Sequence, residues 1–173
     1  YDGARYANNL ISYFARANMN VADRYLASAS LRADGSSRFG PNNRWGFFPA
    51  FSLGWVITSE PWMASLSRLG SFKLRGSYGV TGNQGISDTA YRATYGSANY
   101  GKAGGIAPSI LGNPNLQWEQ TNETDLGFDW TVLDNRIGLA VDHYVKKTKN
   151  LLVSRPVTAT SGFTSFVDNV GNI

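Results

Sequence analysis

The stretch "NETDLGFDWTVLDNRIGLAVDHYVKK", from Asn122 to Lys147, alternates between apolar and polar residues on both sides of a four-residue "LDNR" turn. Successive side chains of a β-strand point to opposite faces of a sheet. The apolar set of the first half comprises Thr124, Leu126, Phe128, Trp130 and Val132. The stretch therefore predicts two antiparallel strands, at about 122–133 and 136–147, with one apolar face and one charged face.

Four earlier segments alternate in the same way, which makes about six strands in all. They cover about 10–20, 25–33, 47–58 and 71–80. The connections alternate between short or intermediate (21–24, 59–70, 133–136) and long (34–46, 81–117, 148 onward). Outer-membrane barrels combine short periplasmic turns with long extracellular loops. We therefore expect an all-β fold, an antiparallel transmembrane β-barrel segment. The intermediate connection predicts a short helix that begins at Ser59 and ends at Gly70.

The composition excludes several classes of protein. The 173 residues include no cysteine, so neither a disulfide scaffold nor a thiolate metal site is available. The net charge of +4 is spread along the chain, whereas nucleic-acid binders concentrate it on one face. No run approaches 18 apolar residues, but a barrel strand crosses a bilayer in about 9–11 residues, so the mean hydropathy of -0.26 is compatible with a barrel. The sequence opens without Met or a signal-peptide pattern and both ends look cut, so we expect a fragment.

The charged residues of the strands fall on one set of faces, and we expect them to line a wet lumen. These candidates are Arg16, Arg32, Lys73, Arg75, Glu123, Asp125, Asp129 and Asp142. A soluble sandwich would expose the same residues, so alternation alone does not separate the two folds. The order of loop lengths favours the barrel.

Neither a catalytic nor a metal site is expected. Glu123 and Asp125 could serve glycoside hydrolysis, but they belong to the charged strand face and lumen lining is the better interpretation. His143 is the only histidine and falls on the apolar face, near one end of its strand. The glycine-rich "TGNQG" and "GKAGG" lack the strand–loop–helix context of a phosphate loop. We expect no cofactor.

Four motifs occur in order: "DGSSRFGPNNRWGFFPAFSLGW" (34–55), "FKLRGSYGVTGNQ" (72–84), "NPNLQWEQTNETDLGFD" (113–129) and "VDHYVKKTKNLL" (141–152). From about Ser12 onward the chain resembles the SusC/RagA family of TonB-linked outer-membrane transporters of Bacteroidota. The resemblance implies a barrel of 22 strands with an N-terminal plug, and TonB-energised import of oligosaccharides or peptides. It also implies a SusD-like surface lipoprotein that acts as a lid.

The resemblance places residues 1–173 in the later half of that barrel. We expect a partial TonB-dependent receptor β-barrel domain in the bacterial outer membrane, without the plug and the TonB box. Its partners would be outer-membrane lipid, the imported solute, the lid and, through the missing N-terminal part, TonB. The sequence leaves two alternatives open: a small complete outer-membrane barrel, adhesive or structural, and a soluble carbohydrate-binding β-sandwich.

The long loops carry the remaining candidates. Aromatic and amide side chains suit sugars as well as a protein partner, so the long segment 81–117 offers ligand or lid contacts. The candidates are Asn83, Gln84, Tyr91, Tyr95, Asn99 and Tyr100. The segment 34–46 is expected to be a structural turn at the extracellular rim. In it Asp34 and Gly35 would tolerate a positive φ, and Arg38 would bind neighbouring carboxylates.

Overall fold

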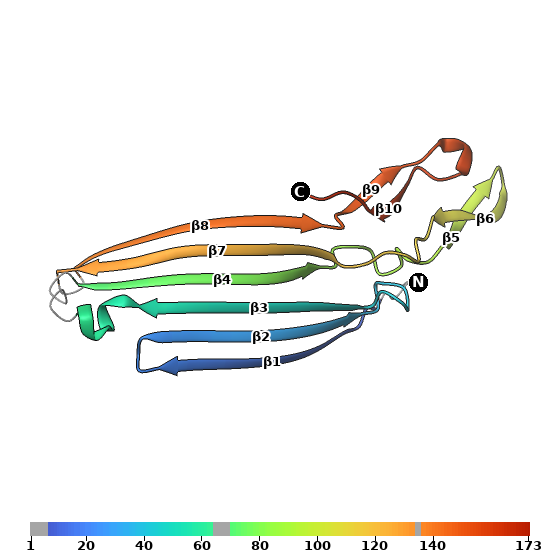
Figure 1. Ribbon diagram of the computed structural model, residues 1–173. Coiled ribbons are helices and arrows are strands. Elements are labelled where there is room, and N and C mark those ends of the chain that lie inside the picture. The colour runs from blue at the N-terminus through green and yellow to red at the C-terminus, as the bar shows by residue number, and fades with distance from the viewer. Residues whose placement is uncertain (1–6, 64–69, 134–135) are drawn as a thin grey trace.

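The computed structural model describes residues 7–63, 70–133 and 136–173. Six long strands form one antiparallel sheet in the order β1-β2-β3-β4-β7-β8 (Figure 1). Their bounds are β1 Leu10–Val21, β2 Tyr25–Ser36, β3 Trp45–Val56, β4 Ser71–Asn83, β7 Glu119–Val132 and β8 Ile137–Lys149. The six strands predicted from alternation are therefore confirmed, although most of them run a few residues further.

The connections separate by length at the two ends of the sheet. At one end lie the short connections after β1 and β7 and the intermediate one after β3, and at the other end the long loops (Figure 1). In the first connection Ala22 and Asp23 both have a φ of 54°, and the amide of Arg24 donates to the carbonyl of Val21 at 3.1 Å. We call the two ends the turn end and the loop end.

One prediction for the connections was wrong. Asp34 and Gly35 do not adopt a positive φ, because both belong to β2 and pair with β1 and β3. This pairing overrides the local turn preference of the Asp-Gly pair. In the stretch where a helix from Ser59 to Gly70 was expected, 3-10 turns cover Ile57–Ser59 (η1) and residues 61–63, and residues 64–69 lie outside the described residues.

The long segment 81–117 is not a plain loop. β4 continues to Asn83, and a hairpin follows, formed by β5 (Thr94–Tyr100) and β6 (Ala103–Ile110). A second hairpin, β9 (Leu152–Pro156) and β10 (Ser165–Asn169), lies in the segment after β8. Both hairpins project beyond the loop end of the sheet (Figure 1). β5 and β6 are rich in glycine and other small residues, and β9 and β10 have only five residues each, so neither hairpin shows the alternation that marks the six long strands.

The hydrophobic core lies at the loop end rather than on the sheet. It consists of Phe39, Phe48, Ile86, Ala90, Leu116 and Trp118. Pairing between β3 and β4 stops at Ala50 and Gly79, while β2–β3 and β4–β7 pairing continues further. The ring of Phe48 lies against Gly82, where any Cβ would overlap it. The sheet thus opens between β3 and β4, and aromatic side chains occupy that region.

The rim turn after β2 is held by this core. Phe39 is fully buried, and the amide of Asn43 donates to the carbonyl of Gly40 at 3.0 Å. Gly40 is required by close approach, since a Cβ there would lie 2.5 Å from the carbonyl oxygen of Pro114. These contacts support the structural interpretation of the turn.

Candidate functional site

The register of the sheet places all eight predicted lumen residues on one face. Partners across antiparallel strands point to the same side, and Ser52 lies opposite both Ser28 and Ser77. The same face of the sheet carries Arg16 on β1 and Arg32 on β2, on one side of these three serines. On their other side it carries the charged residues of β4, β7 and β8. We call this the polar face.

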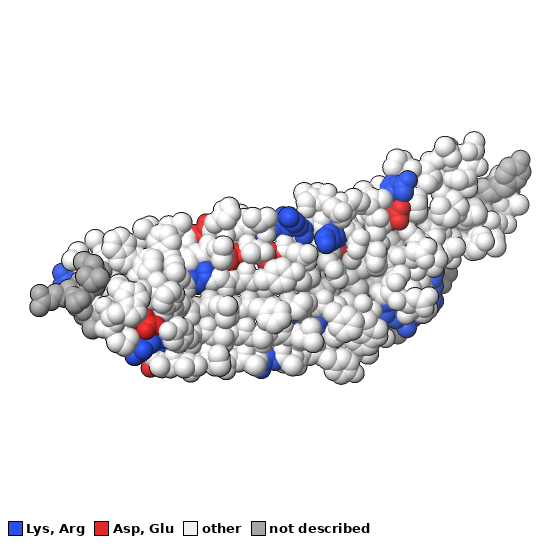
Figure 2. Space-filling model, in the orientation of Figure 1, with Lys and Arg blue, Asp and Glu red and all other residues white. Residues whose placement is uncertain are grey.

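Charge is distributed unevenly over the polar face. Charged atoms of both signs gather over β4, β7 and β8, and few lie over β2 and β3 (Figure 2). The middle of β2 and β3 presents small residues instead: Ser28, Ser30, Ala50, Ser52 and Gly54. The hydroxyls of Ser28 and Ser52 are 2.7 Å apart and hydrogen-bonded. The face therefore combines a small neutral floor with a charged flank.

Arg75 is the centre of the charged flank. From β4 its guanidinium reaches Asp142 on β8 at 2.7 Å. On β7 it reaches Asp129 at 3.2 Å and Asp125 at 3.8 Å. One further pair joins Lys146 to Glu123 at 3.4 Å. Three aspartates share one arginine, which leaves the cluster with net negative charge.

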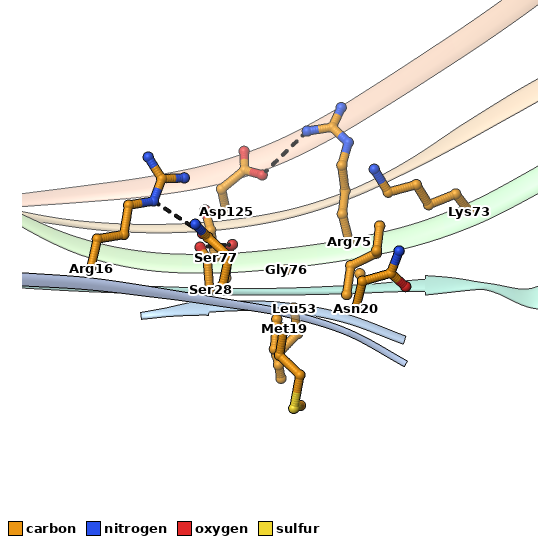
Figure 3. A pocket seen from close by; sticks show the side chains of 15 residues that line it. Arg16, Met19, Asn20, Ser28, Leu53, Lys73, Arg75, Gly76, Ser77 and Asp125 are labelled. Atoms are coloured by element: carbon orange, nitrogen blue, oxygen red, sulfur yellow. Dashed lines mark hydrogen bonds and ion pairs between the residues drawn. The ribbon is translucent and has the colours of Figure 1, made fainter. Parts of the chain in front are cut away.

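A groove of about 570 Å³ runs along the polar face, with Arg16, Asn18 and Asn20 on one side and Lys73, Arg75 and Asp125 on the other. Figure 3 shows side chains on one side of the sheet that include Arg16, Asn20, Lys73, Arg75 and Asp125, while Met19 and Leu53 point to the opposite side. Such a groove presents donors, acceptors and both signs of charge to a solute.

The opposite face is apolar and exposed. Phe51 is 54% exposed, Leu53 69% and Leu126 61%. A soluble protein rarely exposes so continuous an apolar surface. His143 lies on this face, which confirms its predicted side of the sheet. It is opposite Leu126 in the middle of β8, so its predicted position near the end of the strand was wrong.

Two aromatic pairs mark the ends of the apolar face. Trp45 stacks on Tyr13 with ring centroids 6.0 Å apart, and Trp55 stacks on Tyr25 at 6.5 Å. Trp55 lies ten positions after Trp45, which is roughly 33 Å along a strand at about 3.3 Å per residue. A tilt of about 40° reduces this to about 25 Å of height, the apolar band of an outer-membrane barrel.

Glu60 anchors the aromatic pair at the turn end. Its buried carboxylate accepts hydrogen bonds from the hydroxyl of Tyr25 at 2.6 Å and from the indole of Trp55 at 2.9 Å, and Arg24 lies 3.6 Å away. The hydrogen bond from Tyr25, then that from Trp55, lowers the pKa of Glu60 below the usual glutamate value, and these effects outweigh burial, which raises it.

At the loop end, hydrogen bonds join three loops. The Nε of Arg38 lies 2.8 Å from Asp88, so the predicted contact of Arg38 with a carboxylate is confirmed. The side-chain amide of Asn113 donates to the carboxylate of Asp168 at 3.1 Å. The backbone amide of Gln117 donates to the side-chain oxygen of Asn169 at 2.9 Å. The rim is therefore a connected structure that links the turn after β2 to the segment after β8.

The six predicted ligand or lid contacts do not form one site. Asn83 bonds to Glu119 at 3.1 Å, and the backbone carbonyl of Gln84 accepts from Arg38 at 3.1 Å. Tyr91 lines a separate cavity near Arg44 and Arg92. Tyr95, Asn99 and Tyr100 belong to β5, and the side chain of Tyr100 lies outside what the structure describes. The sequence analysis missed Arg44 and Arg92, whose only signal was a polar loop context.

Among the residues described, no cluster of three or more His, Cys, Asp and Glu is placed to hold a metal ion. Within the same ranges, no helix has the length and apolar character needed to cross a membrane.

Fold and face chemistry together define a membrane β-barrel wall with one lipid-facing and one water-facing side. A family model described as "TonB dependent receptor-like, beta-barrel" matches residues 1–173. The chain belongs to this TonB-dependent receptor β-barrel family, whose members are outer-membrane proteins.

Relatives include TonB-dependent receptor P39 of Formosa agariphila, which is 42% identical over 95% of this chain and 16% of its own length. The TonB-dependent receptor SusC of Bacteroides thetaiotaomicron is 36% identical over 96% of this chain and 17% of its own. A solved structure of the RagAB peptide transporter superposes with a TM-score of 0.88 at 34% identity, covering 95% of this chain and 18% of that one. The chain thus spans about a sixth of the curated relatives it matches.

Proposed function

We propose that this chain forms part of the barrel wall of an outer-membrane active transporter that imports oligosaccharides or peptides. Import is energised through TonB, and a SusD-like lipoprotein closes the extracellular side as a lid. In this proposal the eight charged residues of the polar face line the lumen, and the chain's own role is to guide solutes rather than to react with them.

One observation carries the proposal: a sheet of six strands has a charged, grooved face and an exposed apolar face of membrane height. A barrel that carries a polar solute through a bilayer needs a polar inner face toward the solute and an apolar outer face toward the lipid. The polar face supplies hydroxyls, amides and both charges, which bind the hydroxyls of sugars as well as the backbone of peptides.

The relatives support two parts of the proposal, which are transport and its dependence on TonB. One structural relative is a peptide transporter by its title, and others are named TonB-dependent receptors. The carboxylates on the polar face support a structural rather than a catalytic role, because Asp125, Asp129 and Asp142 share Arg75, and Glu123 pairs with Lys146.

The projecting hairpins are the proposed lid contacts. Tyr95 and Asn99 lie on the same side of β5, and Tyr95 is 69% exposed. Exposed tyrosine is favoured at protein interfaces, because it contributes area with few rotatable bonds. Asn83, Gln84 and Tyr91 lie nearer the sheet, and we assign them to the solute rather than to the lid.

Depletion of solutes from the medium tests the function. A strain lacking the intact receptor and a strain lacking TonB are grown on a mixture of labelled oligosaccharides and peptides. We expect both strains to leave the same compounds in the medium, while the parent strain removes them. Uptake that persists without the receptor, or that requires the receptor but not TonB, contradicts the proposal.

A further inference from the structure

We propose that a small cavity at the loop end binds an anionic group of the imported solute, a carboxylate or a sulfate. This inference rests on the proposed transport function, which it makes more specific. The cavity has a volume of about 280 Å³ and is lined by Ser37, Arg44, Asp88, Thr89, Tyr91 and Arg92. It is below the usual size of a whole-ligand pocket, so it suits one small group of a larger solute.

The cavity has an excess of positive charge. The Asp88 carboxylate already accepts from Arg38 at 2.8 Å and from Asn8 at 3.1 Å. Arg92 contacts the ring of Tyr91 at 4.8 Å, and neither Arg92 nor Arg44 forms an ion pair with a carboxylate in the described ranges. Among the residues that the structure describes, two guanidinium groups therefore remain without a counter-charge.

Arg44 adds a second, independent sign of a missing ligand. Its Nε is buried and has no hydrogen-bond partner among the described residues. Buried donors in folded proteins are almost always satisfied, and an unsatisfied charged donor is the costlier case. An anion in the cavity would supply both the hydrogen-bond acceptor and the counter-charge that Arg44 lacks.

The backbone around the cavity is held in place before any ligand binds. The carbonyl of Arg44 accepts from the amide of Ser36 at 3.0 Å and from the indole of Trp118 at 2.9 Å. On the other wall, the amide of Ala90 donates to Ser87 at 3.1 Å and that of Arg92 to Thr89 at 2.9 Å. Ala90 is buried in the aromatic core, and the residues before and after it, Thr89 and Tyr91, line the cavity.

The donors define the class of ligand. A guanidinium binds the planar oxygens of a carboxylate or two oxygens of a sulfate with two parallel hydrogen bonds. The Ser37 oxygen accepts from the amide of Asn9 at 2.9 Å, which leaves its hydroxyl proton free to donate. Both an acidic sugar and a peptide carboxylate carry this chemistry.

Calorimetric titration of the purified intact receptor tests the site directly. Sodium sulfate and sodium acetate are titrated separately at constant ionic strength, against wild type, Arg44→Met and the control Arg136→Met. Arg136 is exposed and lies at the turn end. We expect Arg44→Met to weaken the binding of the preferred anion at least about tenfold and Arg136→Met to leave it unchanged. The anion that binds more tightly identifies the group.

A measurement of folding and a substitute variant make every outcome of the titration decisive. Heat-modifiable migration on gels verifies that Arg44→Met is folded, and the exposed Arg92→Met replaces it if it is not. No anion binding by wild type, or equal binding by wild type and the arginine variants, overturns the inference. Because binding is measured without transport, Arg44-dependent binding in a receptor that imports nothing would refute the proposed function and leave the site standing.

Discussion

Arg75 on β4 and Asp142 on β8 form an ion pair of 2.7 Å across the intervening strand β7. The residue between them in the register is Gly127, which lies opposite Arg75 on one side and Asp142 on the other. A Cβ at this position would overlap the Asp142 carboxylate and lie 3.3 Å from the Arg75 guanidinium carbon. The missing side chain at Gly127 is therefore what lets two non-neighbouring strands exchange charge on the polar face.

Gly127→Ala is expected to separate Arg75 from Asp142 and to destabilise the barrel by about 1–3 kcal/mol, the usual cost of overpacking. Gly138→Ala is the control on β8, where a Cβ meets only Thr131 at 3.8 Å. It should be neutral or stabilising by up to about 1 kcal/mol. Urea unfolding of the two variants in lipid vesicles measures the difference, and equal stabilities would show that Gly127 has no such role.

Arginine scanning on neighbouring β3 positions tests the assignment of the two faces. Phe51→Arg places a charge near the middle of the apolar face and should cost about 2–4 kcal/mol, the penalty for arginine at the bilayer midplane. Ala50→Arg, on the polar face, should cost little. Unfolding in vesicles measures both, and a larger penalty at Ala50 would mean that the faces are reversed.

The six-stranded sheet should keep its pairing when the loop-end core is weakened. Phe39→Ala removes a fully buried ring and is expected to cost about 3–5 kcal/mol of local stability. The six-stranded sheet keeps its pairing, so the variant should remain in the membrane while its long loops become sensitive to added protease on intact cells. Tyr95→Ala, an exposed control, should not change protection. Protected loops in Phe39→Ala would argue against the core.

Glu60 makes the turn end sensitive to acid. Its pKa is lowered in the folded protein by hydrogen bonds from Tyr25 and Trp55, so its contribution to stability is complete above the unfolded glutamate pKa. That contribution is lost as the pH falls through the lower, folded value. Glu60→Gln should therefore have a smaller loss of stability than wild type when unfolding is compared at pH 6 and pH 3. An identical pH dependence would exclude this role.

The sequence predicted the parts of the fold that repeat locally. Alternation through Leu126, Phe128 and Trp130 was enough to place a strand, and a one-residue slip would have turned each of these side chains to the other face. The charged residues of the polar face follow from the same rule. The lengths of the connections predicted that one end of the sheet carries the short turns and the other the long loops.

Other features depend on contacts between residues far apart in the chain. The core joins Phe39 to Trp118, and the anion cavity joins Arg44 to Arg92, with no periodic signal in either segment. The hairpin β5–β6 was missed because its glycine-rich strands lack alternation. The charge-sharing role of Gly127 needed the register of three strands.

Single-cysteine labelling on β3 tests the central claim most directly, since this chain contains no cysteine of its own. Ser52→Cys and Leu53→Cys are introduced one at a time into an otherwise cysteine-free intact receptor in outer-membrane vesicles. A charged, water-soluble thiol reagent should label position 52 and spare position 53, whose attached fluorophore should be quenched by lipid-borne spin labels. Equal aqueous labelling of both positions, or the reverse order, would contradict a barrel wall with a wet polar face and a lipid-facing apolar face.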